Sequence, residues 1–96
     1  MINLLNAATT TATGMAYQPP AGGCYQATVV GTGAVSATVL IEVSIDGVSW
    51  MTLATITLSG TTSHSDGFVA AGGWPNVRAR VSAISGTSAA VTVLHA

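Results

Sequence analysis

The chain has 96 residues, of which two are Arg, three are Asp or Glu and none is Lys, while 49% are hydrophobic. Because ordinary soluble domains are about 25% charged, copies of this chain repel one another weakly, and we expect it to pack against neighbours. Two arginines fall far short of the roughly 6–10 phosphate contacts of a DNA-binding protein. Apolar runs end well before the ~20 residues of a membrane-spanning helix. We therefore expect neither nucleic acid nor membrane as a partner.

Residues 1–23 differ in character from the rest of the chain. They begin with the apolar residues Ile2, Leu4 and Leu5, and they end in a cluster of Pro and Gly at 19–23 that excludes a helix. The start lacks the basic and apolar regions of a secretory signal, so none is expected. We predict an extended N-terminal arm over 1–23 that adds a strand to a neighbour, and a single domain over 24–96.

From residue 24 onward apolar and polar residues alternate with a period of two, which is typical of half-buried strands. The first strand ends at the turn predicted over 31–33. A long strand follows over 35–45, with Leu40 as its one outward apolar residue. Asp46-Gly47 is then a preferred hairpin turn.

The returning strand over 50–59 places Trp50 in register with its apolar positions, so that Trp50 is expected to cover one end of the core. A Ser- and Thr-rich loop is expected from Gly60, and a further turn at 85–87. Five to eight short strands at this spacing, without helical periodicity, predict an all-β fold. We expect an antiparallel β-sandwich or a small barrel of the jelly-roll type.

His64-Ser65-Asp66 is the one cluster in the sequence whose residue types are those of a hydrolase catalytic site. His64 and Asp66 would share a side of an extended segment, but no Gly-x-Ser-x-Gly nucleophile context is present, and we interpret the cluster as a solvated loop. Asp46 and Asp66 each precede Gly, where Asp commonly caps a turn, and no metal-ligand spacing occurs. The single cysteine, Cys24, is interpreted as a small core residue.

Two alternatives stay open for the remaining polar and aromatic residues. Arg78 and Arg80 lie on the non-core face of one strand, where they either pair with Glu42 or grip acidic groups of a partner. Trp50 and Trp74 could stack on sugar rings, although packing in a core or an interface is the favoured interpretation.

Three segments together resemble a known group of proteins. They are Ile-Glu-Val-Ser-Ile-Asp-Gly-Val-Ser-Trp over 41–50, Leu-Ala-Thr-Ile-Thr-Leu-Ser-Gly over 53–60, and Trp-Pro-Asn-Val-Arg-Ala-Arg-Val-Ser-Ala-Ile-Ser-Gly over 74–86. This pattern resembles small β-sandwich virion proteins of tailed bacteriophages, including capsid decoration (cement) proteins. A similar hairpin occurs in discoidin-like and carbohydrate-binding sandwiches.

The resemblance implies a structural virion role without catalytic residues, and it fits the capsid surface and the tail equally. Of these, we expect a non-enzymatic protein on the outer capsid surface of the virion, without cofactor or metal. Its expected partners are the major capsid protein and further copies of itself, as a dimer or trimer. The alternatives are a tail-associated virion protein, and a carbohydrate-binding or adhesion module that uses Trp74 and Tyr17. The residues expected at the assembly interface are Ile2, Leu4, Leu5, Tyr17, Trp74, Arg78 and Arg80.

Overall fold

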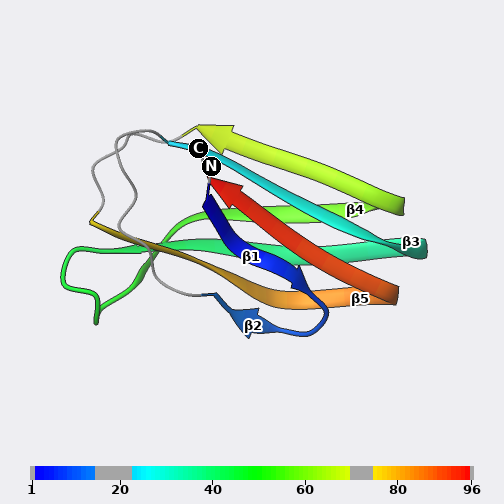
Figure 1. Cartoon of the computed structure of the whole chain (residues 1–96), viewed down its shortest axis with the longest axis horizontal. Helices are drawn as coiled ribbons and strands as arrows, with labels where there is room; N and C mark the ends of the chain where they lie inside the picture. The colour runs from blue at the N-terminus through cyan, green and yellow to red at the C-terminus, as the bar shows by residue number, and fades with distance from the viewer. Residues whose placement is uncertain (1, 15–22, 70–74, 96) are drawn as a thin grey trace.

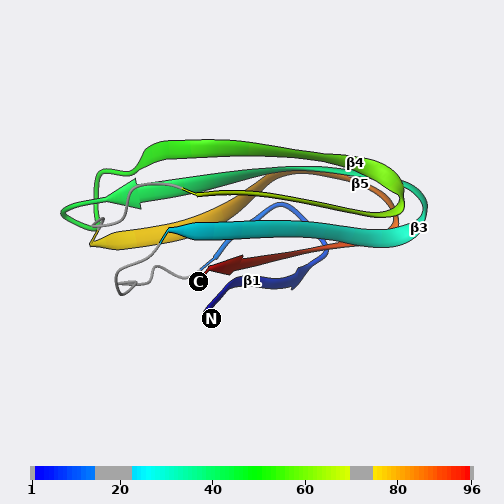
Figure 2. The ribbon, with the colours of Figure 1, turned by 90° about the horizontal axis from the view of Figure 1, so that it is seen from above.

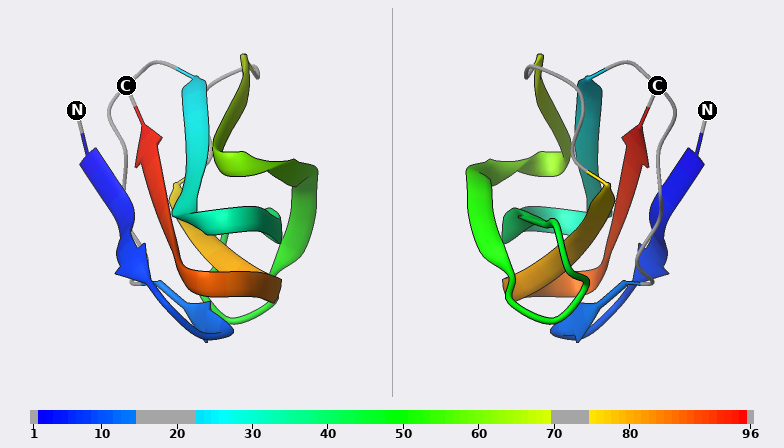
Figure 3. Two further views of the ribbon diagram at one scale, coloured as in Figure 1. Left: turned by 90° about the vertical axis from the view of Figure 1, so that its right-hand side faces the viewer. Right: turned by 90° about the vertical axis from the view of Figure 1, so that its left-hand side faces the viewer.

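The computed structural model describes residues 2–14, 23–69 and 75–95, which form one antiparallel sheet (Figure 1). Its strands are β1 (Ile2–Ala8), β2 (Ala12–Thr13), β3 (Cys24–Ser44), β4 (Met51–Val69) and β5 (Asn76–His95). The order across the sheet is β1-β5-β3-β4, and β2 also pairs with β5. An end-on view shows this order directly (Figure 3). The predicted all-β antiparallel fold is confirmed.

The three long strands bend back on themselves along one shared line, so that the single sheet becomes two layers (Figure 2). Register shifts interrupt the β3–β4 pairing between Val30 and Ala34, and the β3–β5 pairing between Val30 and Ser36. The expected turns at 31–33 and 85–87 and the expected loop after Gly60 do bend the chain back, but they are wrong as boundaries between strands, because β3, β4 and β5 each continue through them. They are bends within continuous strands, and they lie side by side across the sheet.

The backbone conformation at the bend explains why these segments contain residues typical of turns. At the bend, Gly33 and Gly86 have φ values of 71° and 124°. Glycine enters this region without the steric cost that a Cβ imposes. Thr62 and Ser88, also at the bend, adopt positive φ as well. Turn-forming residues are thus used here to fold a strand over, as β-bulges do in curved sheets.

The core fills the space between the two layers, with alternate residues of each strand pointing inward. Its largest fully buried side chains include Ile41 of β3, Leu58 of β4 and Val91 of β5. The alternation predicted over 35–45 is confirmed as far as Val43, since the inward residues up to that point are buried while Leu40 is only partly covered. Ile45 departs from the pattern because it lies in the turn after β3, and 74% of its surface is exposed.

The extended N-terminal arm is not observed in residues 2–14, because β1 and β2 both pair with β5 inside the same sheet. Leu4 and Leu5 are both buried in the core. A register shift between Asn3 and Leu5 accompanies the burial of these consecutive side chains. The amide of Gly14 also donates to the carbonyl oxygen of Ala79 at 2.8 Å, which holds the end of this segment on β5.

Candidate interaction surface

The tip of the β3–β4 hairpin, residues 45–50, presents apolar side chains to solvent. Val48 is 81% exposed and Ile45 is 74% exposed, and Met51 at the start of β4 is 53% exposed. Turns in soluble proteins usually carry polar residues at such positions. We call Ile45, Val48 and Met51 the apolar tip.

The Asp46 side chain holds this turn in one shape. Its Oδ1 accepts hydrogen bonds from the amides of Val48 and Ser49, at 2.9 and 2.8 Å, and from the Ser44 hydroxyl at 2.8 Å. These bonds, from Ser49 and Val48 first and then Ser44, lower the pKa of Asp46 to about 2. The predicted role of Asp46 as a turn cap is confirmed. Across the sheet, Asn76 reaches the carbonyl oxygens of Ser44 and Ile45 at 3.4 Å.

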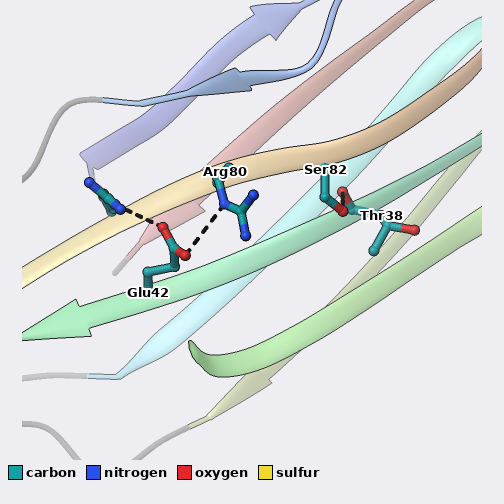
Figure 4. A network of polar contacts seen from close by, with 5 residues as sticks. Thr38, Glu42, Arg80 and Ser82 are labelled. Carbon is teal, nitrogen blue, oxygen red and sulfur yellow. Dashed lines mark hydrogen bonds and ion pairs between the residues drawn. The ribbon is translucent and has the colours of Figure 1, made fainter. Parts of the chain in front are cut away.

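Beside the hairpin, Glu42 binds both arginines of the chain. Glu42 is 7% exposed; its Oε1 lies 2.8 Å from Arg78 Nε and its Oε2 lies 3.4 Å from Arg80 Nε. Figure 4 shows the carboxylate between the two strands that carry these groups. This geometry supports the cross-strand pair, since the acidic partner of both arginines lies within the chain.

Trp50 does not cover the core as expected. The β3–β4 register shifts between Ile41, which pairs with Ala54, and Glu42, which pairs with Thr52. The extra residue in β4 reverses the alternation, so Leu53 packs against the core and Trp50, which is partly buried, lies on the opposite side of the strand. Arg78 lies 4.1 Å from the centre of the Trp50 ring, as a cation–π contact. That contact occupies one face of the Trp50 ring.

The remaining residues of the predicted interface divide into two groups. Leu4 and Leu5 are core residues, and the backbone of Ile2 pairs with His95. Tyr17 and Trp74 lie outside the described residues. Of the residues predicted at the interface, Arg78 and Arg80 lie close together because both contact Glu42. Leu4 and Leu5 lie on β1, and their side chains are buried.

His64, Ser65 and Asp66 lie on β4, paired with β3, rather than in a loop. Each side chain bonds elsewhere: His64 Nδ1 accepts from the Ser59 amide at 3.2 Å, the Ser65 hydroxyl pairs with that of Thr28 at 2.7 Å, and Asp66 Oδ1 accepts from the Gly67 amide at 2.8 Å. These bonds do not assemble a triad. In the described parts of the chain, His, Cys, Asp and Glu form no group of three or more that could hold a metal ion.

A hollow of about 580 Å³ lies at the end of the layer formed by the first half of β3, the last part of β4 and the end of β5. Its aromatic side is Tyr25, whose ring lies 4.8 Å from that of Phe68 and 4.7 Å from that of His95. Burial raises the pKa of Tyr25. His95 Nε2 is buried without a hydrogen-bond partner among the described residues. Cys24, expected in the core, is exposed at the rim of the hollow.

Comparisons with protein-family models, with curated proteins and with solved structures find no match to this chain. No helix among the described residues has the length and apolar character needed to cross a membrane.

The alternation of the sequence does not predict the apolar tip, although the sequence carries a signal for it. The alternation places Ile45 in the core, and it gives Val48 no role. Two β-branched apolar residues flanking Asp46-Gly47 are unusual, because the tip of a hairpin is the part of the chain that a small domain can least easily bury.

Proposed function

We propose that this chain is a non-enzymatic structural protein that decorates the outer shell of a tailed-bacteriophage head. In this role it binds neighbouring major capsid subunits and stabilises their contact. The proposal is supported by the resemblance of the segments 41–50, 53–60 and 74–86 to such proteins, and by a surface with few charges. Its mechanism is binding, so it requires no cofactor and no reacting side chain.

The apolar tip is the observation that carries the proposal. Ile45 and Val48 are among the most exposed large apolar side chains of the described residues, and they lie on a turn fixed by Asp46. A turn that is ordered before binding loses little further conformational freedom on contact, so more of the burial energy appears as affinity. Exposed apolar residues on a rigid support are typical of interaction sites.

The tip also indicates the chemistry of the surface that it fits. Its apolar residues would enter a hollow between shell subunits that is itself apolar. Glu42 neutralises part of the nearby positive charge, and no residue of 43–51 other than Asp46 is charged. Because charge contributes little to such a contact, attachment should change only slightly with ionic strength.

The experiment replaces Ile45 and Val48 with Ser and measures binding to purified shells that lack the protein. The double variant should keep its melting temperature within a few degrees of the original, because both side chains are exposed. It should lose at least about tenfold in affinity, as two buried apolar side chains would contribute more than about 1.4 kcal/mol. Val30→Ser is the matched control, a 48% exposed valine near the bend. Equal binding by all three proteins would exclude the tip as the attachment site.

A further inference from the structure

The outer edge of β4 is an open sheet edge along its whole length in the described structure. β4 pairs with β3 on one side only, and it stands last in the strand order β1-β5-β3-β4. Figure 3 shows it at the margin of the sheet in the end-on views. An open edge presents unpaired amide and carbonyl groups that another strand can bind.

The two halves of this edge differ in how far they are protected. At the bend, His64 accepts the amide of Ser59, and in the second half Asp66 accepts the amide of Gly67, so side chains of the strand occupy backbone donors from Ser59 onward. Asp66 also places a charge there. The stretch Ala54–Leu58 has no charged residue and no Pro or Gly, and none of its amides is hydrogen-bonded to a side chain in the described structure. It therefore lacks the usual protections of an edge strand.

The contact of Ser59 also shows which backbone groups point outward. Its amide bonds to His64 rather than to β3. From Ala54 to Ser59 the register with β3 is unbroken. In a regular antiparallel pair, residues alternate between bonding inward to the neighbour and pointing away from it. The amide and carbonyl groups of Thr55 and Thr57 consequently face outward, and their side chains are exposed.

We infer that this edge pairs with the same edge of a second copy of the chain, forming a two-fold dimer centred on Ile56. In that register Thr55 of one copy lies opposite Thr57 of the other, and each such pair can exchange two backbone hydrogen bonds. The sequence favours a second copy as the occupant because the edge is uncharged, so identical strands meet without repulsion. A two-fold axis also makes the contact self-complementary and closed.

The other free edges of the described sheet fit such a dimer less well. β1 has register shifts at two places, between Asn3 and Leu5 and between Leu5 and Ala8. Such irregularities bend a strand away from flat pairing. β2 is only 2 residues long. The inference concerns the purified chain alone, so it can fail or succeed independently of attachment to a shell.

The test introduces charged residues at the paired positions 55 and 57 and measures dimer formation by sedimentation. Thr55→Lys with Thr57→Lys, and separately Thr55→Glu with Thr57→Glu, should each raise the dimer dissociation constant at least about tenfold, because like charges would face each other twice. An equimolar mixture should recover dimers, since Lys then faces Glu. Ser85→Lys with Thr87→Lys adds the same charge at exposed positions of β5 and should leave dimerisation unchanged.

A cysteine experiment checks the register in a Cys24→Ser background. Thr55→Cys copies mixed with Thr57→Cys copies should form mixed disulfides on mild oxidation, because paired Cα atoms about 5.5 Å apart suit a disulfide. Neither variant alone should do so efficiently. A monomeric original chain, dimers unaffected by both charge pairs, or failure of the mixture to recover dimers would overturn the inference. Uptake of an extended segment from a shell protein by a monomeric chain would also overturn it.

Discussion

At Glu42 two guanidinium groups share one nearly buried carboxylate, and this arrangement decides how the residue responds to substitution. Glu42→Gln keeps the shape of the side chain but removes its charge. We expect the free energy of unfolding to fall by about 1–3 kcal/mol, the usual cost of losing a hydrogen bond to a charged group. Urea unfolding of the purified chain measures it.

The matched control is Arg80→Gln, because the Arg80 side chain is 39% exposed and contacts Glu42 at 3.4 Å. Its loss should cost less than about 1 kcal/mol, as for an exposed pair. If Glu42→Gln costs no more than this control, then Glu42 behaves as an ordinary surface residue. Shell binding by both variants should persist, because the proposed attachment site is the apolar tip, which neither substitution removes.

Asp46 makes the hairpin turn sensitive to acid. The pKa of Asp46 is about 2 in the folded chain, against its ordinary value of 3.8. A lowered pKa means that the ionised group stabilises the folded state above pH 3.8, and that this contribution disappears as the pH falls toward 2. The melting temperature of Asp46→Ala should therefore lie below that of the original at neutral pH. The two curves should converge in acid, and a gap independent of pH would contradict this role.

Trp50 and Cys24 are two residues whose burial the sequence predicted wrongly. Alternation alone put Trp50 on the core side, but one register shift opposite Glu42 reverses it. A shift of this kind leaves no mark in the apolar pattern, because Leu53 and Trp50 are both acceptable core residues. Cys24 is exposed because it begins β3 at the open end of the layers. By contrast, the Asp46 cap and the placement of Arg78 and Arg80 on the same face of the sheet as Glu42 followed from the residues themselves.

At the scale of elements, β1 is expected to be required for folding. Leu4 is 3% exposed within the core, and Leu4→Ala should lower the free energy of unfolding by about 2–5 kcal/mol. Asn6→Ala, an exposed position on the same strand, should change it by less than about 0.5 kcal/mol. Urea unfolding would show both effects. Equal stability of the two variants would restore the interpretation of this segment as an arm.

The bend in the long strands gives a second prediction at this scale. A Cβ at Gly86 would lie 2.9 Å from the Ala34 carbonyl oxygen, while at Gly33 it would meet nothing within 4 Å. Gly33→Ala should cost about 1–2 kcal/mol from its positive φ alone, whereas Gly86→Ala adds a steric clash and should cost roughly 2–4 kcal/mol. Thermal unfolding should rank the two variants in that order. The reverse order would mean that the bend is not packed as described.

For the whole molecule, the fold class was readable from the sequence because period-two alternation over 35–43 has one physical explanation, a sheet with one buried face. The connectivity was not readable. A Ser-Gly-Thr triplet looks the same in a hairpin turn and in a bend within one strand. Only the pairing of β3 with both β4 and β5 on either side of the bend distinguishes them. The apolar tip could not be predicted for a related reason. Whether the side chain of Ile45 is buried or exposed depends on where β3 ends, and the alternation does not mark that end.

We propose that this chain is a fixed component of a phage head, and the composition of the particle tests this proposal most directly. Intact particles would be purified through a density gradient, heads would be separated from tails, and quantitative mass spectrometry would give the ratio of this chain to the major capsid subunit. We expect a constant ratio in the head fraction of every preparation. Absence of the chain from purified heads, or its recovery with tails alone, would contradict the proposed role.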